Sequence, residues 1–386
     1  MNIRTIFNIL SALLVILGVS MFIPVGIAYG YGENDLYGFL WSSVICVALG
    51  IPTWLATRRN RKLTNKDGFA IVSFTWITTA IIGALPFYFS GKFTFTNAFF
   101  EAMSGLTTTG ATILGHSSTM MIEDLTHGLL FWRSFTHFIG GMGIIVFSIA
   151  ILPLLGIGGV QLFKAEVAGP TADKLTPRVK QTAKYLWGIY LGLILLETIV
   201  LYIEGKILGI PKMELFDALC HSFCTIATAG FSTYQNSIAA FDSSVVTWTI
   251  IFFMFLSAIN FTLHFLFIIK GNFDYFKNSE FKVYASLMLM VSLMFFFNIY
   301  RLEIFNNGNF MTIYEKLENS VFYAVSFLTT TGFSTVDYLD WGNASLIIIF
   351  ILLFIGGCAG STTGGIKLIR TLLILKYLQS AIKKLI

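Results

Sequence analysis

The sequence predicts an all-α polytopic membrane protein, and three observations lead to this fold class. First, 56% of the 386 residues are hydrophobic and only 12% are charged, whereas roughly 25% of a soluble domain is charged. Second, apolar runs long enough to cross a bilayer, which takes about 20 residues, recur along the chain. Third, one short hydroxyl-rich motif occurs three times between these runs.

Eight apolar runs are predicted to span the membrane. They lie at 7–30, 38–57, 69–90, 129–155, 184–203, 244–269, 282–300 and 343–377. The last run contains the sequence GGCAGSTTGG, so we expect this span to be broken. The first run is longer than the core of a signal peptide, which has about 7–15 residues, so an uncleaved span is favoured over a signal peptide.

The basic residues predict the topology. Most of the 25 Lys and Arg residues fall in alternate connections, at 1–6, 58–68, 156–184 and 270–282 and in the tail from 367. Most acidic residues fall in the opposite connections. Since Lys and Arg concentrate on the cytoplasmic side, both termini are predicted to be cytoplasmic.

The repeat motif lies in the three long outer connections, 91–128, 204–243 and 301–342. It reads NAFFEAMSGLTTTGAT at 97–112, DALCHSFCTIATAGFS at 217–232 and NSVFYAVSFLTTTGFS at 319–334. Asn97, Asp217 and Asn319 open the motifs and are predicted helix N-caps. An apolar half-helix and an extended Thr-X-Gly segment follow each of them.

The positions of the motifs predict an organisation in repeats. Two N-terminal spans (1–68) precede three span–half-helix–polar segment–span repeats, at 69–183, 184–281 and 282–386.

The Thr-X-Gly segments have a chemistry that suits a cation filter. Non-helical backbone at membrane depth is tolerated only where it is buried in protein or lines water. Backbone carbonyls can replace the hydration shell of a cation, the partly negative end of each half-helix faces the same path, and glycine allows the unusual dihedral angles that this needs. Three segments in register favour this interpretation over ordinary Ser/Thr turns. The predicted filter residues are Thr108, Thr109, Gly110, Ala111, Thr228, Ala229, Gly230, Phe231, Thr330, Thr331, Gly332 and Phe333.

A second polar stretch, GGCAGSTTGGIK at 356–367, interrupts the eighth apolar run. We interpret it as a mobile constriction below the filter; the alternatives are close helix packing through small residues and a simple helix end before the cytoplasmic Lys367 and Arg370. A helical pattern resumes beyond it, which favours the loop. The predicted gate residues are Gly356, Gly357, Gly360, Ser361, Thr362, Thr363, Gly364, Gly365 and Lys367.

A few polar residues lie within apolar runs, where they are costly and often functional. Arg133 is expected to snorkel or to tie down a pore loop, and His137 to make helix contacts. Glu197 is either a proton-coupling carboxylate or a packed acid. Cys220 and Cys224 have the spacing of a metal pair, but no second pair or His cluster supports that interpretation.

With these residues in view, the chain resembles the TrkH/KtrB/HKT superfamily, and in particular its TrkH branch, over essentially its whole length. The stretches that carry the resemblance are TTTGAT, TIATAGFST, LTTTGFST, WRSFTHFIGGMGIIVFSIAILP and GGCAGSTTGGIKLIR. The resemblance implies potassium uptake through a pseudo-fourfold pore, in which Gly110, Gly230 and Gly332 are the filter glycines. It also implies that Gly356–Lys367 is an intramembrane gating loop.

The resemblance further implies partners and a location. The expected assembly is a homodimer in the bacterial cytoplasmic membrane, opened by cytosolic TrkA-type subunits that bind the nucleotide. No cofactor is expected on this chain and potassium is the substrate; nothing resembles a nucleic-acid surface. The family has four repeats and this chain stops after the gate helix of the third. We therefore expect a C-terminally truncated protein or one half of a split system.

Two other classes of function are a coupled secondary transporter and an intramembrane enzyme. A sodium- or proton-coupled secondary transporter would bind its ions at a midplane site in broken helices, for which Glu197 is the available carboxylate. An intramembrane enzyme would need a catalytic dyad or metal set, but neither HExxH nor GxSxG occurs and the His residues do not cluster. No enzymatic activity is expected.

Overall fold

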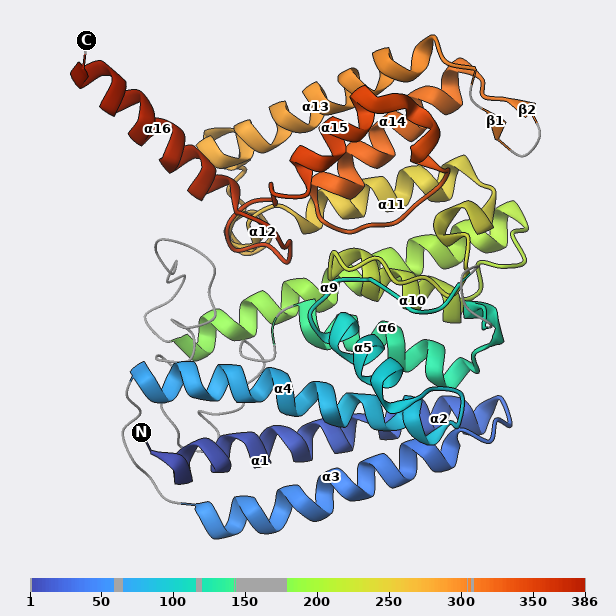
Figure 1. Ribbon diagram of the computed structural model, residues 1–386, viewed down its shortest axis with the longest axis vertical. Coiled ribbons are helices and arrows are strands. Elements are labelled where there is room, and N and C mark those ends of the chain that lie inside the picture. The colour runs from blue at the N-terminus through green and yellow to red at the C-terminus, as the bar shows by residue number, and fades with distance from the viewer. Residues whose placement is uncertain are drawn as a thin grey trace. The chain divides into compact units, whose positions relative to one another are not determined.

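The computed structural model describes residues 2–58, 65–115, 120–141, 143, 179–303, 305–306 and 309–385. These residues are mostly helical (Figure 1), and the strands described are one short antiparallel pair, Phe305–Asn306 and Asn309–Phe310. The chain divides into two compact units, Met1–Val167 with Lys174–Trp187, and Ala168–Asp173 with Gly188–Ile386. The predicted all-α membrane fold class is confirmed.

The first compact unit is a set of helices around the first repeat motif. Its elements are α1 (Ile3–Ser20), α2 (Phe22–Gly30), α3 (Leu36–Thr57), α4 (Asn65–Phe89), α5 (Phe95–Leu106), the 3-10 turn η1 (Ile122–Asp124) and α6 (His127–Gly141). The backbones of α1 and α3 approach closely at Gly18, where a Cβ atom would lie 2.6 Å from Cys46 Cβ. The Ser43 hydroxyl donates to the Gly18 carbonyl at 2.8 Å. Small residues and hydroxyl hydrogen bonds of this kind hold helices together in lipid.

The second compact unit contains the second and third repeat motifs. Helix α9 (Val179–Leu208) begins in the first unit and runs into the second. The other elements are α10 (Leu215–Ile226), η3 (Ser237–Phe241), α11 (Ser244–Ser257), α12 (Phe261–Lys270), η4 (Tyr275–Lys277), α13 (Ser279–Tyr300), β1 (Phe305–Asn306), β2 (Asn309–Phe310), α14 (Ile313–Leu328), η5 (Tyr338–Trp341), α15 (Gly342–Leu352) and α16 (Leu368–Leu385).

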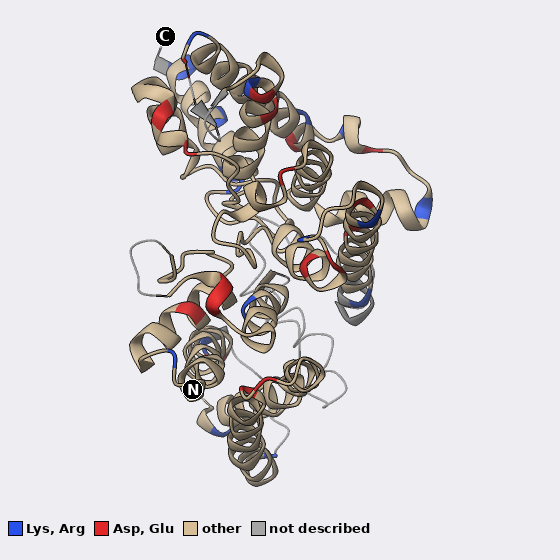
Figure 2. Ribbon diagram, turned by 90° about the vertical axis from the view of Figure 1, so that its right-hand side faces the viewer, with Lys and Arg blue, Asp and Glu red and all other residues tan. Residues whose placement is uncertain are grey.

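Several of these helices are long and apolar enough to cross a membrane. Among the described residues there are five, or six if α11 and α12 count as one bent span. Of the predicted fourth span, 129–155, residues 142 and 144–155 lie outside the described residues. The ribbon in Figure 2 is mostly tan, with charged residues at scattered positions. Leu195, Ile199 and Ile203 form an exposed apolar stripe on α9, as expected of a helix that faces lipid.

The sixth predicted span, 244–269, is divided into two helices. Helices α11 and α12 meet at 96°, because the backbone leaves the helical path at 258–260. The Asn260 side chain accepts the Thr262 N–H at 2.8 Å and caps α12. The Phe261 N–H donates to the Gly360 carbonyl at 3.0 Å. The backbone N–H and carbonyl groups that lose their helical partners at the bend are therefore hydrogen-bonded by the loop that follows α15.

The break expected in the eighth run is present. Helix α15 ends at Leu352 and α16 begins at Leu368. Residues 353–367 form an irregular segment between them, in which Ile355 and Ile366 pair as an isolated parallel bridge.

Candidate functional site

The three half-helices α5, α10 and α14 end in the same unusual backbone. The threonine that opens each Thr-X-Gly segment has a positive φ, of 52° at Thr108, 52° at Thr228 and 57° at Thr330. The glycines also have positive φ: 73° at Gly110, 85° at Gly230 and 84° at Gly332. The expectation of extended segments was therefore wrong, because two of the three residues are left-handed. A β-branched residue in this region is a genuine outlier.

The same pair of hydrogen bonds closes all three helix ends. The N–H of the threonine donates to the carbonyl three residues earlier at 3.0–3.1 Å, and the next N–H donates five residues back at 2.9 Å. This is the Schellman pattern, in which the left-handed position is usually glycine. The acceptors are Gly105 and Ser104 in α5, Thr225 and Cys224 in α10, and Phe327 and Ser326 in α14. Threonine at this position costs about 1–2 kcal/mol of backbone strain.

The three predicted N-caps do not cap their helices. Helix α5 is capped by Thr94 and α14 by Thr312, and α10 begins directly after Glu214. The helices therefore start earlier than the motifs do. Asp217 and Asn319 lie inside their helices, and each accepts a hydroxyl hydrogen bond at 2.6 Å, from Thr233 and Thr335 respectively. Their side chains bind the residues just beyond the glycine of the Thr-X-Gly segment instead of capping the helix N-terminus.

One position of the half-helix carries a different buried polar residue in each repeat: Glu101, His221 and Tyr323. All three side chains are buried. Each of them reaches the residues that follow the glycine of its own Thr-X-Gly segment. Sequence reasoning missed these residues, because their types differ, although the shared position in the aligned motifs was visible.

The contacts of these three residues fix the polar segments. Glu101 Oε1 accepts the Thr112 hydroxyl at 2.5 Å and the Ile113 N–H at 2.7 Å. His221 Nε2 is hydrogen-bonded to Ser232 Oγ at 2.8 Å. The Tyr323 hydroxyl accepts the N–H groups of Thr335 at 3.3 Å and Val336 at 3.2 Å, and it donates to the Val336 carbonyl. Ser104 and Ser326 add hydroxyl bonds to the carbonyls of Ala111 and Phe333.

Arg133 ties α6 to the first half-helix. Its Nε lies 3.1 Å from Glu101 Oε2, and both side chains are almost fully buried. Arg133 does not snorkel; it makes the tie to a pore loop that was the other expectation. Helix α6 also packs closely on α5 at Gly140, where a Cβ atom would lie 2.1 Å from the Leu106 carbonyl oxygen.

The second and third Thr-X-Gly segments lie side by side in the second compact unit. A Cβ atom at Gly230 would lie 2.1 Å from the Thr331 carbonyl oxygen. Beyond the glycines, the Ile238 N–H donates to the Ser334 carbonyl at 3.1 Å. Gly332 has no atom within 4 Å of its Cβ position, so this side of the third segment is open. The first segment belongs to the other compact unit.

The segment 356–367 contacts both of these half-helix ends. The Gly364 N–H donates to Thr330 Oγ1 at 2.8 Å, so one of the strained threonines holds it. The Thr362 hydroxyl donates to the Ile226 carbonyl at 2.9 Å. The predicted gate residues are therefore in direct contact with Thr330 of the predicted filter and with Ile226 at the end of α10.

The segment 356–367 is also closed on itself. The Gly356 N–H donates to the Ile366 carbonyl at 3.0 Å, and a Cβ atom at Gly356 would lie 1.9 Å from the Gly364 carbonyl oxygen. Lys367 is buried, with 4% of its surface exposed. Its ammonium donates to the carbonyl and hydroxyl of Thr363. The Lys367 ammonium thus satisfies carbonyl groups inside this turn, those of Ser361 and Thr363.

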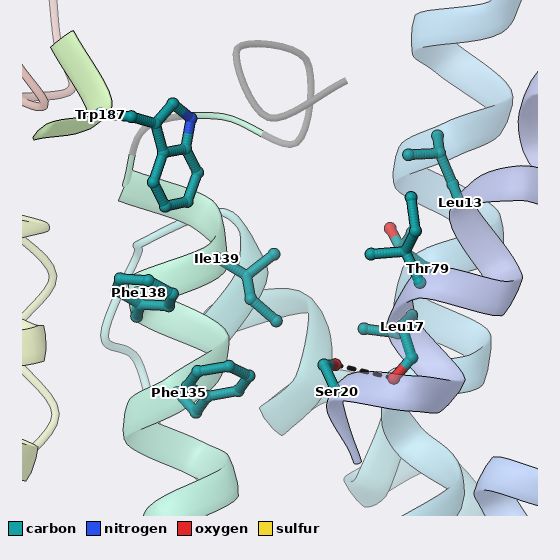
Figure 3. A pocket seen from close by; sticks show the side chains of 9 residues that line it. Leu13, Leu17, Ser20, Thr79, Phe135, Phe138, Ile139 and Trp187 are labelled. Atoms are coloured by element: carbon teal, nitrogen blue, oxygen red, sulfur yellow. Dashed lines mark hydrogen bonds between the residues drawn. The ribbon is translucent and has the colours of Figure 1, made fainter. Parts of the chain in front are cut away.

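A cavity in the first compact unit does not have the chemistry of an ion site (Figure 3). Its lining is apolar apart from the indole N–H of Trp187 and the hydroxyls of Ser20 and Thr79, which donate to the carbonyls of Leu17 and Thr75 in their own helices at 2.7 Å. Two hydroxyl oxygens are too few to replace the hydration shell of a cation. Within the described ranges, no group of three or more His, Cys, Asp or Glu residues could hold a metal ion.

Comparison with known proteins places the chain in a family. The profile of the TrkH family, described as "Cation transport protein", matches residues 38–386. The Trk system potassium uptake protein TrkH of Vibrio parahaemolyticus is 37% identical over 393 residues, which cover 100% of this chain and 78% of that protein. The TrkH protein of Escherichia coli K12 is also 37% identical, over 100% of this chain and 77% of its own length.

A solved structure agrees with these sequence matches. The crystal structure of the potassium transporter TrkH from Vibrio parahaemolyticus superposes with a TM-score of 0.83 and 35% identity, covering 100% of this chain and 77% of that one. This chain is therefore a multi-pass membrane protein and a member of the TrkH family of cation transport proteins.

Proposed function

We propose that this protein takes up potassium through a channel-like pore whose filter is built from the Thr-X-Gly segments. The observation that carries the proposal is the left-handed threonine and glycine at the same two positions of all three motifs. The relatives named above are potassium uptake proteins, which supports potassium as the ion.

The backbone conformation supports a filter for a physical reason. In an ordinary strand, successive carbonyls point to opposite sides. Left-handed residues at the first and third positions, with an ordinary residue between them, turn successive carbonyls toward one side. A row of such carbonyls can replace the hydration shell of a cation. Hydrogen bonds from the half-helix hold the row, so the carbonyls need little reorganisation when the ion arrives.

The segment 356–367 is the proposed gate of this pore. It touches the ends of both half-helices in the second compact unit, through Thr362 and Gly364, and a shift of the loop would change the exit from the filter. The repeats of the pore correspond to 69–183, 184–281 and 282–386, after the two N-terminal helices of 1–68.

The proposal extends to the assembly. The protein acts as a homodimer in the bacterial cytoplasmic membrane, with both termini cytoplasmic. A cytosolic TrkA-type subunit regulates it and carries the nucleotide, and this chain needs no cofactor of its own. The Trk system named for the relatives supports such a partner.

The function is tested by growth of a potassium-uptake-deficient bacterium at low potassium. The chain is expressed alone, and also extended by the part of a TrkH relative that the match does not cover. At least one form should restore growth and accumulate potassium in preference to sodium. If both forms reach the membrane and neither moves potassium, the proposed function is wrong.

Coupled secondary transport is the competing proposal, and Glu197 separates the two. This carboxyl lies fully buried in α9. In a channel it only packs, so the isosteric Glu197→Gln should change potassium uptake by less than about twofold. In a coupled transporter the substitution should abolish uptake or its dependence on the coupling ion.

Glu204→Gln, two turns along the same helix, is the matched control; Glu204 accepts the Thr249 hydroxyl at 2.7 Å. Uptake and its sodium and proton dependence are measured in cells.

A further inference from the structure

One carboxylate on α13 holds both ends of the segment 360–368. Glu280 lies in the first turn of α13 and is 6% exposed. Its Oε1 accepts the Ala359 N–H at 2.8 Å and the Ile369 N–H at 3.0 Å. Ala359 lies just before this segment, and Ile369 lies in the first turn of α16.

The residues between these two anchors are those that contact the half-helices. Thr362 donates to the end of α10, and Gly364 donates to Thr330. The segment is thus hydrogen-bonded to the half-helices through its middle residues and to Glu280 at its two ends.

The chemistry of the tie is that of an electrostatic anchor. A carboxylate that accepts backbone N–H groups forms charge-assisted hydrogen bonds, which are roughly twice as strong as neutral ones. The positive end of the α13 dipole favours a negative charge in its first turn. Asn278 caps this turn by accepting the Phe281 N–H at 3.0 Å. This cap fixes the first turn of α13, which carries Glu280.

We infer that Glu280 is the positioning residue that keeps the gating loop against the filter, and that the loop is released when these two hydrogen bonds break. This inference rests on the proposed role of 356–367 as the gate. A regulatory partner could act on this anchor through the neighbouring surface. Glu280 follows directly on the connection 271–278 between α12 and α13, whose Lys277 is 83% exposed. A partner that pulls this connection moves the anchor before it moves the loop.

The rate at which the Cys358 thiol is labelled measures how often the segment 356–367 opens, and this measurement does not depend on transport. Its side chain is 1% exposed, and its N–H donates to the Ala258 carbonyl at 3.0 Å. One protein keeps Cys358 as its sole thiol, with the other cysteines replaced by alanine: Cys46, Cys220 and Cys224. A second, reference protein keeps only Cys220, which is buried in α10. Both are labelled with a membrane-permeant maleimide in intact vesicles.

Glu280→Ala should speed the labelling of Cys358 by at least about tenfold, because two charge-assisted bonds are lost, and should leave Cys220 labelling unchanged. Glu280→Gln keeps an acceptor but loses the charge, so its effect should be smaller. Glu303→Ala is the matched control, since Glu303 is an exposed carboxylate just past the other end of α13. Equal labelling of Cys358 in wild type and Glu280→Ala would overturn the inference. So would a parallel rise at Cys220, because that indicates general unfolding.

If Glu280→Ala does not accumulate in the membrane, Glu280→Gln decides: wild-type labelling of Cys358 in that variant overturns the inference. Potassium flux is then measured in the same vesicles without any cytosolic partner. Glu280→Ala should raise basal flux. Faster labelling with no flux in any variant leaves the anchor standing and contradicts the proposed conduction instead.

Discussion

Gly230→Ala is expected to abolish potassium uptake while the protein still reaches the membrane. The new Cβ atom would lie 2.1 Å from the Thr331 carbonyl oxygen, and 3.2 Å from the backbone carbons of Thr331 and Gly332. These are backbone atoms of the neighbouring segment, so no side-chain rotation relieves the overlap. The residue also has φ of 85°, where alanine is strained by about 1–2 kcal/mol. The neighbouring segment must therefore move, and its carbonyls leave their positions.

Gly332→Ala is the matched control for this steric argument. Its φ is 84°, but no atom lies within 4 Å of the Cβ position, so only the strain applies. We expect uptake to be reduced and not lost, and Gly332→Ser to alter the preference for potassium over sodium. Flux of each variant is measured in vesicles with potassium and with sodium. Wild-type flux in Gly230→Ala would contradict the side-by-side placement of the two segments, and unchanged selectivity in Gly332→Ser would contradict the filter assignment.

Arg133→Met is expected to destabilise the protein strongly. It removes one partner of a fully buried ion pair, whose atoms Arg133 Nε and Glu101 Oε2 are 3.1 Å apart, and leaves the Glu101 carboxylate buried. Such a change costs about 3–5 kcal/mol. Because the same carboxylate holds Thr112 and Ile113, the first polar segment should loosen as well. Thermal unfolding of the purified protein in detergent measures the loss.

The control is Arg301→Met, which removes an exposed arginine at the C-cap of α13 and should leave the unfolding temperature nearly unchanged. The double variant Glu101→Gln with Arg133→Met removes both charges and should recover part of the lost stability. If Arg133→Met unfolds at the wild-type temperature, the pair does not stabilise the fold.

The features predicted correctly from the sequence are those that depend on hydropathy, on glycine content and on the alignment of the three repeat motifs. Composition and apolar run length predicted a helical membrane protein, and the density of glycine predicted the break between α15 and α16. The alignment on Gly110, Gly230 and Gly332 predicted positions that share a positive φ. Glycine signals such backbone directly, because it lacks the Cβ atom that forbids it.

Other features depend on contacts between distant segments, which a single sequence does not report. The sequence does not predict the left-handed threonines, because hydrogen bonds that close the half-helices hold them in this conformation. Nor does it predict that the Thr330 hydroxyl accepts the Gly364 N–H. The bend between α11 and α12 arises because the loop after α15 satisfies the freed backbone groups. Asn97, Asp217 and Asn319 were read as caps because local propensity favours that role. The helices in fact begin earlier, and the side chains of Asp217 and Asn319 are used by the segment beyond the glycine.

The bracing of each polar segment by its own half-helix has a consequence for how such a protein can change by recombination. Glu101, His221 and Tyr323 each contact residues 11 to 13 positions further along the same motif. A half-helix and its segment therefore form one exchangeable module. Transplanting only the Thr-X-Gly residues would separate them from their partners, whereas moving the half-helix together with the chain up to Ile113, Ser232 or Val336 carries the partners with it. Gene duplication followed by divergence of whole motifs keeps this requirement intact at every step.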